Sequence, residues 1–479
     1  MSTITRVYRS RVPAAPTDVL AWHDNPCVFE RLTPPWKKVR VVEAQGSIAP
    51  GDSKHLRVSI AGPLEFSWKL VHGEIPNQAG FADIQQEGPF RSWRHEHRFF
   101  PDGEADTMLE DRLTYDLPFG IAGRFLGGKR VESELDRLFR FRHRRTQIDL
   151  SRHSHFAATQ PLRIAVTGST GLVGHRLVAF LRSGGHEVLR LVRHPVQAND
   201  EVFWDPESSR IDAASLEGLD AVIHLAGVSI AGGRWTRSRK AAILSSRLDG
   251  THLLAKTLAH LSQPPRVFVP ASAVGYYGNA GREVLTEHSS PGTGFLAEVC
   301  KGWEAASQPA SAAGIRVVHP RFGVVLAAED GLLPLISRVF QLGGGGPLGS
   351  GEQYMSWIAL DDLIGILLHA VTDDSLKGPV NAVAPEPVTN REFSSILARV
   401  LVRPAFVRTP AAAMRLAGGE LADELILASQ RALPAKLSDQ GFQFAFPTLE
   451  DALRHELGRY DGAGSWDPAV SKANDRRVA

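Results

Sequence analysis

A glycine-rich turn between an apolar strand and a helix is the feature that most constrains this chain. In LRIAVTGSTGLVGHRLVAFL the strand ends just before Gly168, and Gly171 and Gly174 follow. The first glycine allows a tight turn, the second lets a pyrophosphate approach the backbone, and the third lets helix and strand pack closely. The helix start offers free N–H groups and a positive dipole end to phosphates. We therefore predict a dinucleotide site. Its residues are Gly168, Ser169, Thr170, Gly171, Leu172, Val173 and Gly174.

The pattern of strands and helices from residue 162 onward predicts that this turn belongs to a parallel sheet. Short, almost continuously apolar strands such as DAVIHLAG, RVFVPAS and IRVVHPRFGVVL alternate with segments of helical periodicity. Such alternation is typical of parallel strands covered by helices on both faces. The sequence predicts an α/β Rossmann-type domain over residues 162–458, of which residues 376–458 are mainly helical.

Several motifs of this region resemble a known superfamily. The G-x-x-G-x-x-G spacing, HLAG at 224–227 and ASAVGYYG at 271–278 resemble the extended branch of the short-chain dehydrogenase/reductases. FLAEVCKGWEAA, GGGGPLGSGEQYMSWIALDD and ALPAKLSDQGFQFAFPTLEDAL narrow the resemblance to NAD(P)-dependent epimerase-like proteins with a C-terminal segment of unknown function. This resemblance implies further dinucleotide contacts. They are Leu225, Ala226, Gly227, Arg247 and Val325.

The end of the second strand indicates which dinucleotide is bound. Proteins that bind NAD place an acidic residue there, which holds the ribose 2′-hydroxyl. This chain has Arg193 and His194 in HEVLRLVRHP. A guanidinium group suits a 2′-phosphate, so the sequence favours NADP(H), while NAD(H) stays possible. The alternative is that Arg193 is only a solvated strand end.

The usual catalytic residues of the superfamily are missing. The resemblance implies a Tyr as proton donor, a Lys four residues later that lowers its pKa, and a nearby hydroxyl group. When Glu304 is aligned with the helical glutamate of extended relatives, Leu296 takes the Tyr position and Cys300 the Lys position. The hydroxyl position falls on Ala273, beside Ser272. We expect Cys300 to be a buried, small apolar residue rather than a nucleophile.

Other polar residues near the fifth strand are candidates to replace that machinery. Ser272, Tyr276 and Tyr277 follow the strand, and Glu287 lies close behind them in the sequence. One hypothesis is that one of the two tyrosines donates a proton and that Ser272 orients the substrate oxygen. The alternative is that both tyrosines pack and that Ser272 caps a turn. The glycine run at 343–346 is open to two similar interpretations, as a backbone that approaches substrate or as a flexible loop.

Residues 1–150 have a different pattern, which predicts an α+β domain. Alternating apolar residues indicate strands at 64–72, 93–99 and 109–115, and helical spacing follows at 131–139. GPFRSWRHEHRF, RLTPPW and LTYDLPFG resemble the START-like (SRPBCC) helix-grip domains, a resemblance that implies an apolar ligand cavity. The residues expected on its inner face are Trp68, Trp93, His95, His97 and Asp111.

Two interpretations of the polar residues on that face stay open. If they face the cavity, they contact either a ligand or each other, because buried polar groups need partners. The competing interpretation reverses the phase of the strands or makes these residues a satisfied core network. Two histidines at i and i+2 with one remote aspartate are not a sufficient zinc signature, so no metal site is expected.

Composition restricts the remaining possibilities. A charge of +2 over 479 residues argues against a strongly basic nucleic-acid-binding protein. The two cysteines are too far apart in sequence to indicate a disulfide framework or a cysteine metal site. No apolar run reaches the roughly 18 residues that a membrane span requires, and the first residues lack a signal-peptide pattern. We expect a cytoplasmic protein with a linker at 151–161 and a disordered tail at 459–479; the sequence does not indicate the oligomeric state.

Two functional hypotheses follow. The first is an NADP-binding oxidoreductase or epimerase-like protein that acts on a small organic substrate and carries an N-terminal module for a hydrophobic ligand. The second is a catalytically reduced dinucleotide-binding sensor or interaction protein, which the missing Tyr and Lys favour.

Overall fold

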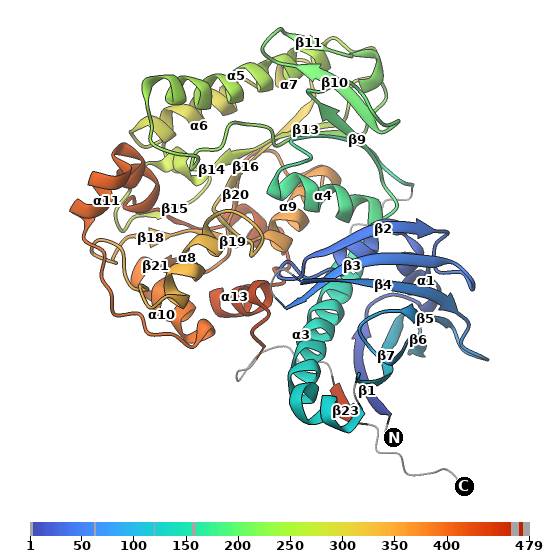
Figure 1. Cartoon of the computed structure of the whole chain (residues 1–479). Helices are drawn as coiled ribbons and strands as arrows, with labels where there is room; N and C mark the ends of the chain where they lie inside the picture. The colour runs from blue at the N-terminus through green and yellow to red at the C-terminus, as the bar shows by residue number, and fades with distance from the viewer. Residues whose placement is uncertain (1–2, 62–63, 119, 156–159, 461–468, 473–479) are drawn as a thin grey trace. The chain divides into compact units, whose positions relative to one another are not determined.

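The structure is a computed structural model, and it describes residues 3–61, 64–118, 120–155, 160–460 and 469–472. The chain forms two compact units (Figure 1). The first comprises Met1–Ala157 together with Leu457–Ala479, and the second comprises Ala158–Glu456. Each unit is described by itself.

The first unit is an antiparallel sheet with a long helix. Its strands follow the spatial order β2-β3-β4-β5-β6-β7-β1-β23. The strands are β1 (Ile4–Val12), β2 (Val39–Gln45), β3 (Ser53–Ala61), β4 (Leu64–Gly73), β5 (Gly80–Glu87), β6 (Ser92–Asp102), β7 (Asp106–Asp116) and β23 (Ala469–Lys472). The helices are α1 (Pro16–Asp24), α2 (Pro26–Arg31) and α3 (Gly120–His155). The three strands and the helix that the sequence predicts are therefore confirmed within β4, β6, β7 and α3.

One face of this sheet packs against α3. Tyr8 of β1 stacks on Phe139 of α3 with 4.8 Å between ring centroids. Along β6, Trp93, His95 and His97 are buried, and the residues between them are more exposed. Alternate side chains of a strand point to opposite faces of its sheet. The alternation of buried and more exposed residues along β6 therefore confirms that Trp93, His95 and His97 share the inner face.

The structure corrects the predicted linker. Helix α3 continues to His155, so residues 151–155 are helical. Asp149, near the end of this helix, forms a fully buried bidentate ion pair with Arg31 at 2.6 and 2.8 Å. This contact fixes the last turns of α3 to α2, a long-range interaction that local sequence patterns do not show.

The structure also corrects the predicted tail. Residues 469–472 are not disordered but form β23, which pairs antiparallel with β1 through Arg6↔Lys472 and Arg9↔Ala469. β1 would otherwise be an edge strand with unpaired backbone groups, and such an edge favours the addition of another strand. Residues 461–468 and 473–479 of the tail lie outside the described residues.

The second unit is built on a largely parallel sheet in the order β11-β10-β9-β8-β12-β13-β16-β14, with β20 also paired to β16. Its strands are β8 (Arg163–Thr167), β9 (Glu187–Val192), β10 (Glu201–Asp205), β11 (Arg210–Ile211), β12 (Ala221–His224), β13 (Val267–Pro270), β14 (Ser272–Ala273), β16 (Arg316–Phe322) and β20 (Gly378–Ala382). Three small two-stranded pairs accompany it. They are β15 (Val284–Leu285) with β22 (Arg431–Ala432), β17 (Val324–Leu326) with β19 (Trp357–Ala359), and β18 (Tyr354–Met355) with β21 (Val388–Thr389).

Helices cover both faces of this sheet (Figure 1). Helix α4 packs against α9, and α5 packs against α6 and α7. The helices are α4 (Leu172–Ser183), α5 (Arg237–Ala259), α6 (Phe295–Ala305), α7 (Gln308–Ala312), α8 (Leu332–Gln341), α9 (Leu360–Thr372), α10 (Asn390–Leu401), α11 (Ala411–Gly418), α12 (Ala435–Asp439) and α13 (Leu449–Leu457). The predicted Rossmann-like architecture is confirmed. Residues 376–458 contain the helices α10, α11, α12 and α13, but they also contain long irregular segments and contribute β20 to the main sheet.

The strand order identifies where a ligand belongs in the second unit. β8 lies between β9 and β12, so the chain leaves β8 toward one side and later returns to its other side. Ligands of such sheets bind beyond the carboxyl ends of the strands at this reversal point.

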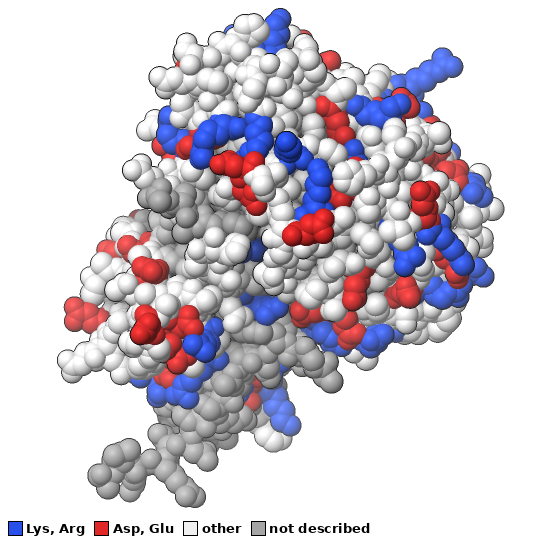
Figure 2. All heavy atoms as spheres, turned by 180° about the vertical axis from the view of Figure 1, so that it is seen from behind, with Lys and Arg blue, Asp and Glu red and all other residues white. Residues whose placement is uncertain are grey.

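Surface charge and hydropathy add two observations. On the face drawn in Figure 2, lysine and arginine side chains lie among aspartate and glutamate side chains. Within the described ranges, no helix combines the length and the apolar character that crossing a bilayer would require.

Candidate functional site

The predicted glycine turn lies at this reversal point, between β8 and α4. Gly168 has a φ of +67°, and a Cβ atom there would lie 2.9 Å from the backbone nitrogen of Ala226. A Cβ atom on Gly174 would lie 2.1 Å from the carbonyl oxygen of Gly168. Gly171 is exposed and forms the N-cap of α4, whose first N–H groups have no partner within the helix. The backbone therefore forms a cradle of the kind that holds a pyrophosphate.

The buried hydroxyl group of Thr167, just before this turn, links β8 to the segment that follows β12. The Oγ1 atom of Thr167 accepts hydrogen bonds from the backbone N–H groups of Leu225 at 3.0 Å and Ala226 at 3.1 Å. Its own proton is therefore donated to Nδ1 of His224, 2.6 Å away. Burial lowers the pKa of His224 to about 3, so the imidazole is neutral. Sequence analysis missed both side chains, because their pairing depends on the alignment of β8 with β12.

Arg193 stands at the end of β9, as the sequence predicts. Its side chain is exposed, and it forms no hydrogen bond or ion pair with any residue of the described chain. The nearby Arg190, by contrast, is held by Asp200 through contacts of 2.7 and 3.0 Å. The guanidinium group of Arg193 is therefore available for an anionic ligand.

The other expected dinucleotide contacts have different environments. Arg247 is buried, and its Nη1 atom donates to the carbonyl oxygens of Val228 at 2.9 Å and Ile243 at 3.2 Å. A Cβ atom on Gly227 would lie 3.3 Å from this guanidinium group. Arg247 therefore supports the segment that follows β12. Val325 is half-buried in β17, opposite Ile358 of β19.

Ser272 is part of a buried ionic network rather than a turn cap. Its Oγ atom donates to Oε1 of Glu304 at 2.7 Å. Both oxygens of Glu304 accept hydrogen bonds from Arg321, each at 2.8 Å. Ser272 is 1% exposed, so its hydroxyl group is not directed to solvent.

The same network engages one of the two tyrosines. The hydroxyl group of Tyr277 accepts a hydrogen bond from Arg321 at 2.9 Å and lies 2.7 Å from Oδ1 of Asn381. Burial raises the pKa of Tyr277. Glu287 accepts from the backbone N–H of Asn381 at 3.0 Å and is also buried. Tyr277 and Glu287 therefore have structural partners.

Tyr276 differs from its neighbour. Its ring lies under the guanidinium group of Arg321, with 3.5 Å from Cζ to the ring centroid. The side chain is only half-buried, and its hydroxyl group has no hydrogen bond within the part of the chain that the structure describes. Of the four expected catalytic residues, Tyr276 is the one that combines partial exposure with a hydroxyl group free of hydrogen bonds in the described chain; Oε2 of Glu287 also lacks a hydrogen bond there, but it is buried.

The positions that the superfamily uses for Tyr and Lys are filled by apolar groups. Leu296 and Cys300 on α6 are buried, at 6% and 3% exposure. They pack against Gly275. A Cβ atom added to this glycine would lie 3.3 Å from Cβ of Leu296 and 3.7 Å from Sγ of Cys300. Burial raises the pKa of Cys300 to about 12. Cys300 is therefore a neutral thiol, as expected.

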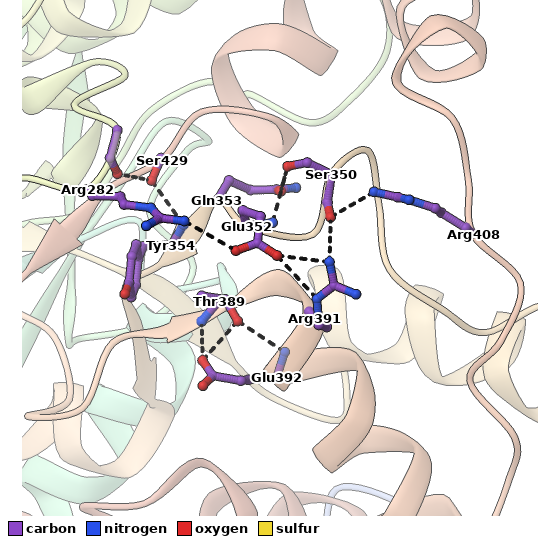
Figure 3. A network of polar contacts seen from close by, with 11 residues as sticks. Arg282, Ser350, Glu352, Gln353, Tyr354, Thr389, Arg391, Glu392, Arg408 and Ser429 are labelled. Carbon is purple, nitrogen blue, oxygen red and sulfur yellow. Dashed lines mark hydrogen bonds and ion pairs between the residues drawn. The ribbon is translucent and has the colours of Figure 1, made fainter.

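The glycine run leads into a polar network (Figure 3). The carbonyl oxygen of Ser350 accepts from Arg391 at 3.1 Å and from Arg408 at 3.0 Å. Glu352 forms ion pairs with Arg391 at 2.8 Å and Arg282 at 3.6 Å. Two arginines thus contact Ser350, in the segment that follows the glycine run.

The first unit contains a separate cavity of about 430 Å³. Trp68, Trp93, His95 and His97 line it, as predicted. Asp111 lies behind the two histidines, and one of its oxygens is 2.9 Å from each of them. Although burial opposes protonation, Asp111 raises the pKa of His97 to about 9. Sequence analysis missed further polar lining residues. Four of them, which come from other strands and a helix, are His23, Lys54, His72 and Asp83.

Comparisons with known proteins agree with this architecture. The profile of the NAD dependent epimerase/dehydratase family matches residues 164–382, and a domain of unknown function, DUF1731, matches residues 409–456. The epimerase family protein Mb2239 of Mycobacterium bovis is 44% identical over 296 residues, which are 62% of this chain and 98% of the relative.

Two solved structures extend the comparison. The nucleoside-diphosphate sugar epimerase from Corynebacterium glutamicum is 34% identical with a TM-score of 0.76, over 94% of this chain and 90% of that chain. The human epimerase family protein SDR39U1, solved with NADPH, is 35% identical with a TM-score of 0.57, over 61% of this chain and 98% of that chain. With the glycine cradle at the reversal point of its sheet, the chain belongs to the NAD dependent epimerase/dehydratase family.

Proposed function

We propose that the second unit binds NADP(H) in preference to NAD(H). The observation that carries this proposal is the exposed, unpaired guanidinium group of Arg193 at the end of β9. A 2′-phosphate would give it a charge-assisted partner, whereas a 2′-hydroxyl would not. The human relative solved with NADPH supports the same choice.

We further propose that the protein is an oxidoreductase or epimerase-like enzyme for a small organic substrate. The bound cofactor would supply or accept hydride. Tyr276 would supply or accept the accompanying proton, because its hydroxyl group is uncommitted and its ring is held in place by Arg321. Ser272 and Tyr277 would position this region through their contacts with Glu304 and Arg321.

A second candidate function is dinucleotide binding without turnover. Leu296 and Cys300 favour it, because they fill the usual Tyr and Lys positions with apolar, buried groups. Such a protein would use the bound dinucleotide as a signal or as a structural element.

For the first unit we propose a START-like module that binds a hydrophobic ligand. The antiparallel sheet, the long helix α3 packed on it and the largely apolar cavity support this proposal. A fluorescent apolar probe that binds the protein and loses affinity in Trp93→Ala would agree with it. A probe that binds equally well to both proteins would argue against it.

The main experiment is a titration of the full chain with NADPH and, separately, with NADH, in which intrinsic fluorescence reports binding. Tighter binding of NADPH is expected, and absence of NADPH binding would refute both candidate functions. NADPH consumption with a panel of small carbonyl compounds then separates them. Turnover that is lost in Tyr276→Phe supports the enzyme, and binding without turnover of any compound supports the second candidate.

A further inference from the structure

Histidine and aspartate side chains from three neighbouring strands converge in the cavity of the first unit. Asp83 of β5 pairs with His72 of β4 on one side and with His95 of β6 on the other. His97 lies two residues further along β6, on the same face. All four residues line the cavity.

The two distances from Asp83 to the histidines are close to those of ligands that share one ion. Oδ2 of Asp83 lies 3.6 Å from Nδ1 of His95 and 3.4 Å from Nε2 of His97. Both distances exceed the roughly 2.7–3.2 Å of ordinary hydrogen bonds. Donor atoms bound to one tetrahedral Zn²⁺ at about 2.0–2.1 Å lie about 3.3 Å apart. One donor atom from each of these three residues lies within 4.8 Å of the others.

A second layer of groups orients the two imidazoles. Oδ1 of Asp111 lies 2.9 Å from Nε2 of His95 and 2.9 Å from Nδ1 of His97, which are the ring nitrogens directed away from Asp83. Oδ2 of Asp111 lies 2.9 Å from His143, which in turn contacts Ser10 at 2.7 Å. A carboxylate behind each ligating histidine is the usual arrangement in protein metal sites.

His72 is a third imidazole beside the same carboxylate. It is 4% exposed, and its Nδ1 atom lies 2.8 Å from Oδ1 of Asp83. Oδ2 of Asp83 is the oxygen that lies near His95 and His97. His72 therefore contacts one oxygen of Asp83 and leaves the other directed toward the two histidines of β6.

We propose that Asp83, His95 and His97 bind one divalent transition-metal ion, whose remaining positions face the cavity and are open to water or to a bound ligand. Two histidines and one carboxylate with open positions suit Zn²⁺ or Fe²⁺. The proposal rests on the geometry of the cavity and does not depend on dinucleotide binding by the second unit. The alternative is a metal-free network in which a protonated imidazole bridges Asp83 and Asp111.

The test uses the full chain after treatment with a chelator. We expect calorimetric titration to show tight binding of one Zn²⁺ per chain, and Co²⁺ to give visible absorption bands. Asp83→Asn, which keeps the side-chain shape, should weaken Zn²⁺ binding by more than about 100-fold, and Asp111→Asn by about 10- to 100-fold. His252→Ala, an exposed histidine of α5, is the matched control and should bind normally.

Anomalous scattering at the zinc edge from crystals of the wild-type protein is the measurement that does not depend on any variant. An ion between Asp83, His95 and His97 supports the proposal. Three results would overturn it: no Zn²⁺ bound by the folded wild-type chain, unchanged affinity in a folded Asp83→Asn variant, or an ion located at the other possible cluster, Asp361, His455 and Glu456. Binding of the apolar probe is measured separately, in the absence of metal. Failure of the START-like proposal can therefore be distinguished from failure of the metal proposal.

Discussion

The hydroxyl group of Thr167 lies 2.6 Å from Nδ1 of His224 and joins the ends of β8 and β12 under the glycine turn. Because the same oxygen accepts two backbone N–H groups, Thr167→Val would leave these partly buried groups without that partner. Each such group costs about 1–3 kcal/mol. We expect the variant to lose at least about 2 kcal/mol in the free energy of unfolding, measured with urea, and to bind NADPH more weakly. Thr372→Val, at the end of α9, should change neither quantity appreciably and is the control.

The neutral, buried His224 makes the stability of the protein depend on pH. The unfolded chain protonates this imidazole near pH 6.5, whereas the folded chain holds its pKa at about 3. The unfolded state therefore binds more protons in this window, and the free energy of unfolding falls as the pH is lowered from about 6.5 toward 3. In His224→Gln the slope of unfolding free energy against pH should be smaller, by up to about 1.4 kcal/mol per pH unit. Equal slopes for both proteins would contradict this assignment.

Arg193 should decide between the two dinucleotides. We expect Arg193→Ala to weaken NADPH binding by about 10- to 100-fold, since a charge-assisted hydrogen bond contributes about 1.5–3 kcal/mol. Binding of NADH should stay within about twofold, because no phosphate contact is lost. Arg266→Ala, an exposed arginine just before the start of β13, is the matched control in the same fluorescence titration. An equal loss of affinity for both dinucleotides would place Arg193 elsewhere in the site.

Two glycines on helices should respond in opposite directions to alanine. Gly174→Ala places a Cβ atom 2.1 Å from the carbonyl oxygen of Gly168, so the turn must open; the variant should be destabilised and lose NADPH binding. A Cβ atom on Gly127 of α3 meets nothing within 4 Å. Gly127→Ala should therefore raise the free energy of unfolding by about 1 kcal/mol and leave NADPH binding unchanged. Thermal unfolding and the same titration check both expectations.

The two cysteines should differ in reactivity. Burial raises the pKa of Cys300 to about 12, so almost no thiolate is present at pH 8. Cys27 is partly exposed. A disulfide reagent added to the native protein should therefore modify Cys27 and spare Cys300, and both should react in denaturant. Rapid modification of Cys300 in the native protein would show that α6 opens readily.

Patterns over a few consecutive residues correctly predicted the glycine turn and the inner face of β6. The spacing of Gly168, Gly171 and Gly174 located the turn, and alternation along β6 placed His95 and His97 on the inner face. In both cases the geometry follows from consecutive residues.

Contacts between distant segments were not predictable in this way. Asp83 joins His95 and His97 only through the register of β5 with β6, and Thr167 meets His224 only through the pairing of β8 with β12. The buried Glu304–Arg321 pair likewise depends on how α6 packs near β16. For this reason the cofactor turn was predicted more completely than the polar network around Ser272.

The pairing of β23 with β1 has a consequence for how the chain is made. β1 precedes the whole second unit in the chain, whereas its neighbour β23 follows that unit and is therefore synthesised later. The antiparallel sheet therefore waits for its final strand while the dinucleotide-binding unit is completed. Deleting the residues from 457 onward should leave a nascent-like first unit with an uncovered sheet edge, a surface open to strand exchange between copies or to chaperones.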